Sequence, residues 1–219
     1  PGKASDLPPE GCPVPVLADP AGDPAAALAA LAAAVDAPAD AATLQAAVRP
    51  ELPTGPLTAD GVCQALGALL PEGAIVSDEG NTSGLFAAGH TAGAPPHDWM
   101  ACPGRKVIGL ESDGSAMYTV QSWWTMAREN LDVVTILFNN ASYAVLNMEL
   151  NRVGATEGGP KAKEMLDLTR PTMDFTAIAQ GCGVPATRAT TAEEFVDQLR
   201  AALATPGPTV IEAIVPSII

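Results

Sequence analysis

The sequence predicts an α/β fold in which a parallel sheet carries helices on both faces. From Leu57 onwards, short apolar runs alternate with stretches of helical periodicity, which is typical of parallel strands joined by helical crossovers. The length of 219 residues suits one such domain with a short appendage.

The first 57 residues differ from the rest because they are rich in Ala and Pro. Residues 14–18 suggest a short strand, and residues 24–35 (PAAALAALAAAV) have a high helix propensity. We interpret residues 1–36 as the remnant of a preceding domain and residues 37–57 as a linker, because prolines accumulate towards position 56. The main domain is then expected over residues 58–219.

Five strands and five helices, alternating for the most part along the chain, are expected in this domain. The strands are predicted at 73–77, 106–111, 133–138, 185–189 and 209–215. The helices are predicted at 59–70, capped by Thr58, and at 116–130, 143–152, 174–182 and 191–204.

The connection between the first two strands does not fit this scheme. Residues 90–104 (HTAGAPPHDWMACPG) have no clear period, and residues 83–88 can form only a short helix. A crossover between parallel strands normally contains a helix of at least ~10–12 residues. We therefore expect a segment to be missing here.

Composition excludes several functions. The net charge is −14, from 25 acidic and 11 basic residues, which argues against nucleic acid or anionic membrane as partners. No apolar run reaches the roughly 18 residues of a membrane span. The four cysteines contain no CxxC pair, so reduced thiols and a cytoplasmic location are expected.

Polar residues capable of binding a metal follow two successive strands of the predicted sheet. Asp113 comes after the strand at 106–111, and Asn140 comes after the strand at 133–138. Because ligands of parallel sheets bind beyond the carboxyl ends of the strands, we expect both side chains at one edge. Carboxylate, amide and carbonyl oxygens suit Mg²⁺, and a following helix can receive a phosphate on its first N–H groups. Taken alone, the dipeptides Asp113-Gly114 and Asn139-Asn140 are more often structural turns or loops than functional sites.

The stretch SDGSAMYTVQSWWTMARENLDVVTILFNNASYAVL resembles the signature of thiamine-diphosphate-dependent enzymes, in which GDG precedes NN by some two dozen residues. Here 24 residues separate Gly114 from Asn139. The chain is most similar to the group of acetolactate synthase large subunits and benzoylformate decarboxylases, from Leu57 to its end. Its first residues, PGKASDLPPEGC, resemble the end of that family's α/β middle domain.

The resemblance assigns roles to residues of this chain. It implies Asp113 and Asn140 as side-chain ligands of Mg²⁺, with the backbone carbonyl of Ser142 as a third ligand. It implies that the diphosphate is contacted by the backbone at Gly114 and Ser115 and approached by the loop from Glu79 to Ser83. The full set of expected cofactor-binding residues is Glu79, Asn81, Thr82, Ser83, Ser112, Asp113, Gly114, Ser115, Asn140, Ser142 and Tyr143.

Other residues are placed near the site or in the core. The family places the helix that begins with Tyr143, Leu146 and Asn147 near the substrate, although core packing explains the first two equally well. We expect Trp123 to pack in the core and Trp124 to lie at a subunit or domain contact.

Two departures from the family pattern stand out. Ser112 replaces the first glycine of GDG, and its side chain could crowd the end of the strand. Relatives also carry a glycine-rich turn and a helix, which help to hold the aminopyrimidine, between the positions of Trp99 and Cys102. Deletion, proteolysis or disorder would each explain a gap between residues 100 and 102, and we favour disorder because the segment would lack its ligand.

The resemblance implies a thiamine-diphosphate- and Mg²⁺-dependent 2-oxo-acid decarboxylase or carboligase of the acetolactate synthase type, a transferase or lyase. The alternatives are a benzoylformate-decarboxylase-like lyase and a non-catalytic cofactor-binding or assembly protein. Family members are homodimers or homotetramers whose subunits share the active site. The activating glutamate lies on another domain, so no catalytic residue is expected in this chain, and use of FAD stays open.

Overall fold

The computed structural model describes residues 22–40, 43, 45–99, 105–154 and 159–217. The chain divides into two compact units, residues 1–44 and 45–219. In the first unit, helix α1 (Pro24–Ala34) begins at Asp23, whose carboxylate accepts hydrogen bonds from the N–H groups of Ala25 (2.9 Å) and Ala26 (3.2 Å). The helix predicted at 24–35 is confirmed, and the strand predicted at 14–18 lies outside the described residues.

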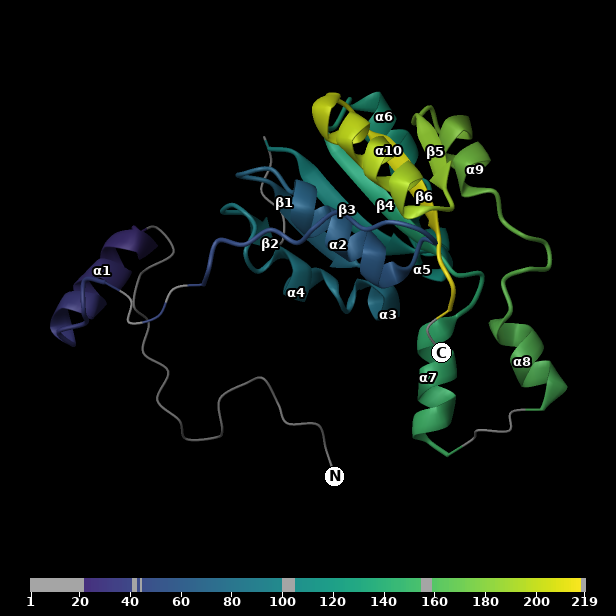
Figure 1. The fold of residues 1–219 in the computed structure, drawn as a ribbon, viewed down its shortest axis with the longest axis horizontal. Helices are drawn as coiled ribbons and strands as arrows, with labels where there is room; N and C mark the ends of the chain where they lie inside the picture. Colours follow the sequence, from purple (N-terminus) through teal and green to yellow (C-terminus); the bar gives the residue numbers. More distant parts are fainter. Residues whose placement is uncertain (1–21, 41–42, 44, 100–104, 155–158, 218–219) are drawn as a thin grey trace. The chain divides into compact units, whose positions relative to one another are not determined.

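The second unit is built on a six-stranded parallel sheet with the order β2-β1-β3-β4-β6-β5 (Figure 1). Its strands are β1 (Ile75–Glu79), β2 (Asp98–Trp99), β3 (Val107–Ser112), β4 (Val133–Asn139), β5 (Ala186–Ala189) and β6 (Thr209–Ile214). All five predicted strands are present, each within two residues of its expected ends. The central pair β3 and β4 is in register, with Val107 opposite Val133 and Ser112 opposite Phe138.

Helices cover both faces of the sheet, which confirms the predicted fold class. Helices α2 (Ala59–Leu69) and α10 (Ala192–Ala204) lie across one face (Figure 1). Helices α6 (Ser122–Arg128) and α9 (Phe175–Gly181) pack on the other. Side chains alternate between the faces along β4, since Phe138 belongs to the first core and Leu137 to the second.

The helix predicted at 116–130 is two helices, which corrects the expectation of a single element. Helix α5 (Asp113–Thr119) starts directly after β3, and α6 follows it. Between them the N–H groups of Trp123 and Trp124 donate to the carbonyls of Val120 and Gln121, three residues back. These short-range bonds tighten the backbone and interrupt the α-helical ladder.

The crossover from β1 contains elements that periodicity did not predict. Two short helices, α3 (Asn81–Gly84) and α4 (Ala87–Thr91), lead to β2, which pairs with β1 only at Ile75 and Val76. The seven residues 100–106 then join β2 to β3 on the far side of β1. The expected gap between residues 100 and 102 lies outside the described residues.

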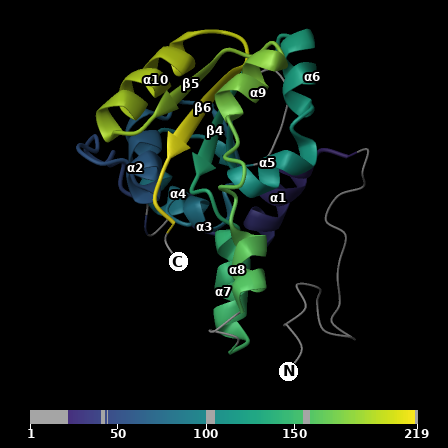
Figure 2. The ribbon, with the colours of Figure 1, turned by 90° about the vertical axis from the view of Figure 1, so that its right-hand side faces the viewer.

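Helices α7 (Ala144–Arg152) and α8 (Pro160–Leu166) extend away from the sheet at the carboxyl ends of its strands (Figures 1 and 2). The helix predicted at 143–152 is therefore confirmed, and α8 was not predicted. None of the described helices is long and apolar enough to cross a membrane.

Residues 45–57 form the first segment of the second unit and are held to the rest of it by Arg49 and Leu57. The Arg49 guanidinium donates to the carbonyls of Ala68 (2.5 Å) and Leu70 (2.9 Å), which satisfies acceptors at the end of α2. Leu57 is buried, and its N–H donates to the carbonyl of Thr190.

Candidate functional site

A cavity of about 160 Å³ opens where β3 and β4 end. These strands are neighbours in the centre of the sheet, so the loops that follow them meet at the same edge. The cavity is lined by Asn81, Thr82, Ser112, Asp113, Gly114, Ser115, Tyr118, Asn140, Ser142, Tyr143, Ala144, Val145 and Leu146. The structure thus brings most of the predicted site residues into one cavity.

Asp113 joins the two loops through its carboxylate. It is 1% exposed, and its Oδ1 accepts a hydrogen bond from the N–H of Gly114 at 2.8 Å. Its Oδ2 accepts from the N–H groups of Asn140 (3.0 Å) and Ala141 (2.6 Å) at the end of β4. Burial raises the pKa of this carboxyl, while the backbone N–H groups of residues 114 and 140–142 act in the opposite direction.

The loop after β4 has a conformation that several hydrogen bonds maintain. Ala141 has a φ of 55°, a left-handed conformation that costs a residue with a Cβ roughly 1–2 kcal/mol. Its N–H lies between Asp113 Oδ2 and Asn139 Oδ1 (3.1 Å), and its carbonyl accepts from Leu168 N–H at 3.0 Å. Asn140 Oδ1 accepts from the N–H of Ser142 at 3.0 Å, forming an Asx turn.

The carbonyl of Ser142 belongs to a second tight turn. It accepts from the N–H of Ala144 at 2.8 Å across Tyr143, whose φ of −72° and ψ of 67° define an inverse γ-turn. This turn starts α7, and the hydroxyl of Ser142 accepts from the side-chain amide of Asn147 at 3.1 Å.

The oxygens at this edge fit a hard cation. Asp113, Asn140 and Ser142 line one cavity. Asp113 Oδ1, Asn140 Oδ1 and the Ser142 carbonyl each accept one of the hydrogen bonds described above, which leaves each of these oxygens a second lone pair. Mg²⁺ accepts such ligands and takes the others from phosphates and water. Among the residues that the structure describes, no group of three or more His, Cys, Asp or Glu could hold a metal. A cation at this edge would combine the carboxylate of Asp113 with neutral oxygens.

The loop after β1 contributes the opposite wall. Asn81 and Thr82 line the cavity, whereas Glu79 and Ser83 do not. The Asn81 side-chain amide donates to the carbonyl of Glu79 at 3.0 Å and to the hydroxyl of Ser115 at 3.4 Å, which ties this loop to α5. Ser83 is buried, and its carbonyl accepts from the Cys63 thiol at 3.6 Å.

Ser112 stands where the family has a glycine, and its side chain makes a hydrogen bond to the loop after β1. Its hydroxyl donates to the carbonyl of Gly80 at 2.9 Å, so the side chain connects the end of β3 to the loop after β1. Nearby, the Ser115 hydroxyl donates to Glu111, whose half-buried carboxyl has a pKa raised chiefly by burial and lowered in part by this bond.

Three cavity residues were not predicted: Tyr118, Ala144 and Val145. Tyr118 is three residues after Ser115 on α5 and therefore lies on the same helix face. The spacing from Ser115 could have indicated Tyr118 from the sequence; in the structure the residue is 79% exposed.

Comparison with known sequences defines the class of protein. The sequence pattern of the family described as thiamine pyrophosphate enzyme, C-terminal TPP binding domain, matches residues 76–213, so the chain belongs to that family. The matched range includes all six strands apart from the first residue of β1 and the last of β6, together with the cavity at the ends of β3 and β4.

Two curated relatives resemble the chain over different shares of its length. The chain is 53% identical over 239 aligned positions to the Mycobacterium tuberculosis protein named "Putative acetolactate synthase large subunit IlvX", covering 100% of this chain and 46% of that protein. It is 36% identical over 113 positions to benzoylformate decarboxylase of Pseudomonas aeruginosa, covering 52% of this chain and 20% of that enzyme. The chain thus spans less than half the length of the curated relatives it matches.

A solved structure shares the fold. The thiamine diphosphate-dependent 4-hydroxybenzoylformate decarboxylase of Rhodococcus jostii RHA1 superposes with a TM-score of 0.68 at 25% identity, covering 87% of this chain and 39% of that enzyme.

Proposed function

We propose that this chain is the diphosphate- and Mg²⁺-binding part of a thiamine-diphosphate-dependent 2-oxo-acid decarboxylase or carboligase of the acetolactate synthase type. One observation carries the proposal: the carboxylate of Asp113 spans the ends of two adjacent strands and holds the loop that presents Asn140 and Ser142. The relationship to an acetolactate synthase large subunit over the whole chain supports the same assignment.

In this proposal Asp113, Asn140 and Ser142 hold the cation, and the cation holds the diphosphate. The backbone of Gly114 and Ser115 would contact the phosphates, and the loop from Glu79 to Ser83 would approach them through Asn81 and Thr82, which line the cavity. Thiamine diphosphate supplies the electron sink that allows a 2-oxo acid to lose CO₂. The net charge of −14 would otherwise repel a diphosphate, so the cation is needed for binding as well as for orientation.

We also propose that relatives carry a segment between β2 and β3 that this chain lacks. The seven residues 100–106 are fewer than the dozen or so that a parallel crossover needs. The alignment with the M. tuberculosis relative runs over 239 positions against 219 residues here, which leaves at least 239 − 219 = 20 positions without a counterpart. Both observations support the expected gap.

Two other functions have support. A benzoylformate-decarboxylase-like lyase is favoured by the 36% identity to such an enzyme and by the related solved structure. A non-catalytic cofactor-binding or assembly protein is favoured by the short connection at 100–106. Products formed from pyruvate and from benzoylformate by the complete protein separate the three, because acetolactate indicates the first function, an aldehyde the second and no turnover of either substrate the third.

The setting of the reaction is also a proposal. We place the protein in the cytoplasm, with a 2-oxo acid as substrate and with paired identical subunits that share each active site. The activating glutamate would come from another domain, so the residues of this chain bind and orient the cofactor.

The direct test is a calorimetric titration of the complete protein with thiamine diphosphate, with and without Mg²⁺. Asp113→Ala should weaken metal-dependent binding by at least about 100-fold, since even a residue that only supports a metal ligand can contribute that much. Asp197→Ala is the matched control, because its side chain is 79% exposed on α10. Unchanged binding by Asp113→Ala would overturn the assignment of the metal site. A folded wild-type protein without binding would leave the non-catalytic assembly role.

A further inference from the structure

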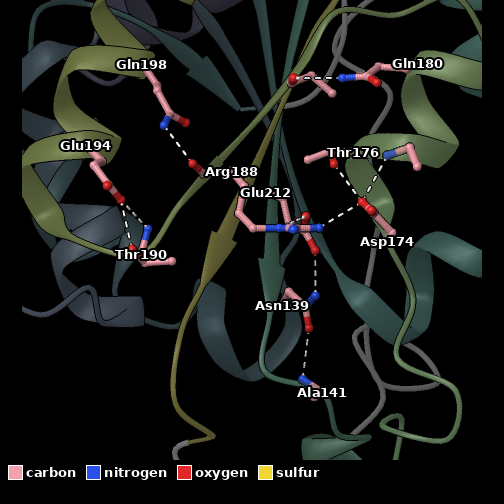
Figure 3. Close-up of polar contacts among 12 residues, drawn as sticks. Asn139, Ala141, Asp174, Thr176, Gln180, Arg188, Thr190, Glu194, Gln198 and Glu212 are labelled. Carbon is pink, nitrogen blue, oxygen red and sulfur yellow. Dashed lines mark hydrogen bonds and ion pairs between the residues drawn. The ribbon is translucent and has the colours of Figure 1, made fainter.

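Glu212 is a buried carboxylate behind the site that the proposed function does not explain. It lies in the middle of β6, between β4 and β5, and is 0% exposed. Its Oε2 accepts from Arg188 Nε on β5 at 2.7 Å, and its Oε1 accepts from the Asn139 side-chain amide on β4 at 2.7 Å (Figure 3). Arg188 also donates to Asp174 at 2.8 Å, which anchors its position at the surface.

Asn139 connects this carboxylate to the candidate metal site. Its Nδ2 donates to Glu212, and its Oδ1 accepts from the N–H of Ala141 at 3.1 Å (Figure 3). The same N–H donates to Asp113 Oδ2 at 2.6 Å. A continuous series of hydrogen bonds therefore runs from Arg188 through Glu212, Asn139 and Ala141 to Asp113.

The chemistry of Glu212 determines how the Asn139 amide points. An amide has a donor end and an acceptor end of nearly the same shape, whereas an ionised carboxylate only accepts. Facing Glu212, Asn139 must turn its NH₂ group towards β6 and its oxygen towards Ala141. An apolar residue at 212 would avoid the cost of burying a charge, but it would leave this orientation unspecified.

We propose that Glu212 and Asn139 are positioning residues for the Mg²⁺-diphosphate site, an inference that rests on the proposed function. Glu212 orients Asn139, and Asn139 holds Ala141 in its left-handed conformation, with φ at 55°. That conformation turns the backbone so that the N–H groups of residues 140 and 141 reach Asp113, while Asn140 and Ser142 face the cavity.

The proposal is tested by exchanging the hydrogen-bond donor and acceptor between positions 139 and 212. Asn139→Asp places a second carboxylate against Glu212 and removes the donor, so it should weaken metal-dependent binding. Combining it with Glu212→Gln restores the contact with the polarity reversed. In the double variant the new side-chain amide at position 212 donates to the new carboxylate at position 139, and the amide oxygen faces Arg188. The net charge of the double variant equals that of the wild type.

Binding is measured in the complete protein with Mn²⁺ as the probe, by electron paramagnetic resonance in the presence of thiamine diphosphate. Asn139→Asp should reduce Mn²⁺ affinity about 10–100-fold, the usual effect of losing a residue that orients a metal ligand, and the double variant should recover to within about threefold. Amide hydrogen exchange of the unloaded protein, followed at Ala141, should accelerate in the single variant and slow again in the double variant. Thr176→Ala is the control, since Thr176 contacts only the exposed Asp174 side chain of this network.

The outcomes distinguish the positioning role of Glu212 and Asn139 from the proposed metal site itself. A folded Asn139→Asp protein with wild-type Mn²⁺ affinity and wild-type exchange at Ala141 would overturn the positioning role while leaving the metal site intact. A lower unfolding temperature with unchanged affinity in the folded protein would reduce the network to a structural one and overturn it as well. If Asn139→Asp does not fold, the double variant decides alone, because a folded double variant that binds more than tenfold weaker contradicts the proposal. A wild-type protein that binds no Mn²⁺ with thiamine diphosphate overturns both.

Discussion

The ring of Tyr143 packs against the backbone of Gly114, so there is no room for a side chain at position 114 of α5. A Cβ placed on Gly114 would lie 2.5 Å from Cε1 and 2.7 Å from Cδ1 of that ring. This contact brings the segment after β4 close to the segment after β3 and thereby sets the width of the cavity between them.

Gly114→Ala should destabilise the protein by about 1–3 kcal/mol, because the ring of Tyr143 must move. The double variant Gly114→Ala with Tyr143→Ala should lose less stability than the sum of the single variants, since the clash is gone. Urea denaturation measures all three. Gly109→Ala is the control, because a Cβ there meets nothing within 4 Å. Equal effects at both glycines would contradict the packing argument.

The two neighbouring tryptophans of α6 should differ in their contribution to stability. Trp123 is 3% exposed and packs edge-on against Phe175, with ring centroids 6.4 Å apart, so Trp123→Ala should cost about 3–5 kcal/mol. Trp124 is 53% exposed, with the Arg128 guanidinium 4.8 Å from its ring centroid, and Trp124→Ala should stay within about 0.5 kcal/mol. Chemical denaturation of both variants provides the comparison, and a large loss at Trp124 would show that its ring is covered in solution.

The thiol of Cys63 should not react with alkylating reagents in the folded protein. Burial, with smaller contributions from Asp78 and Asp60, raises the pKa of its thiol from 9.0 to about 12. Iodoacetamide at pH 8 should therefore leave the peptide containing Cys63 unmodified until the protein is denatured, as mass spectrometry can show. Rapid modification of Cys63 under native conditions would contradict the burial.

The same shift has a defined effect on stability. Because the folded state holds the proton more tightly than the unfolded state, the unfolding free energy should fall as the pH rises from 9.0 towards about 12. The variant Cys63→Ala should show a shallower decline over this range in denaturation experiments. Identical slopes for the two proteins would mean that Cys63 does not cause the decline.

Helix α10 begins with a capping box that should be measurable. The Thr191 hydroxyl accepts from the N–H of Glu194 at 3.2 Å, and the Glu194 carboxylate accepts from the N–H of Thr191 at 3.2 Å. Thr191→Ala should cost about 1 kcal/mol in thermal or chemical denaturation, whereas Thr191→Ser keeps the acceptor and should cost much less. Equal losses in the two variants would point to the methyl group instead of the cap.

The features that sequence predicted best are those with a strong local signal. Asp113 and Asn140 were predicted to lie at one edge of the sheet, and both line the cavity there, because each follows a strand of the central pair and adjacent parallel strands end at one edge. Strand β2 was missed because two residues at a sheet edge have no detectable period. The break between α5 and α6 was missed because residues 116–130 have no Gly or Pro to mark it.

The hydrogen bonds that support the site could be identified only from the structure. Glu212 is a charged residue within the otherwise apolar run of β6, and this anomaly was visible, but its partners come from β4 and β5, which are distant in sequence. Likewise, no pattern could show that the hydroxyl of Ser112 would bond to Gly80 across 32 positions of the chain. Contacts of this kind depend on strand order, which periodicity does not encode.

Strand β6 is inserted between β4 and β5, and its Glu212 bonds to Asn139, which precedes it by 73 residues. The N–H of Val215 also donates to the carbonyl of Asn139, at 3.0 Å. A ribosome that adds about 5–20 residues per second needs about 4–15 s to make the intervening chain. Once Leu146 has been made, the nascent polypeptide contains every cavity residue but still lacks strand β6, which orients them. On the proposed function, binding of the cofactor therefore follows the completion of the sheet and is a late event of biosynthesis.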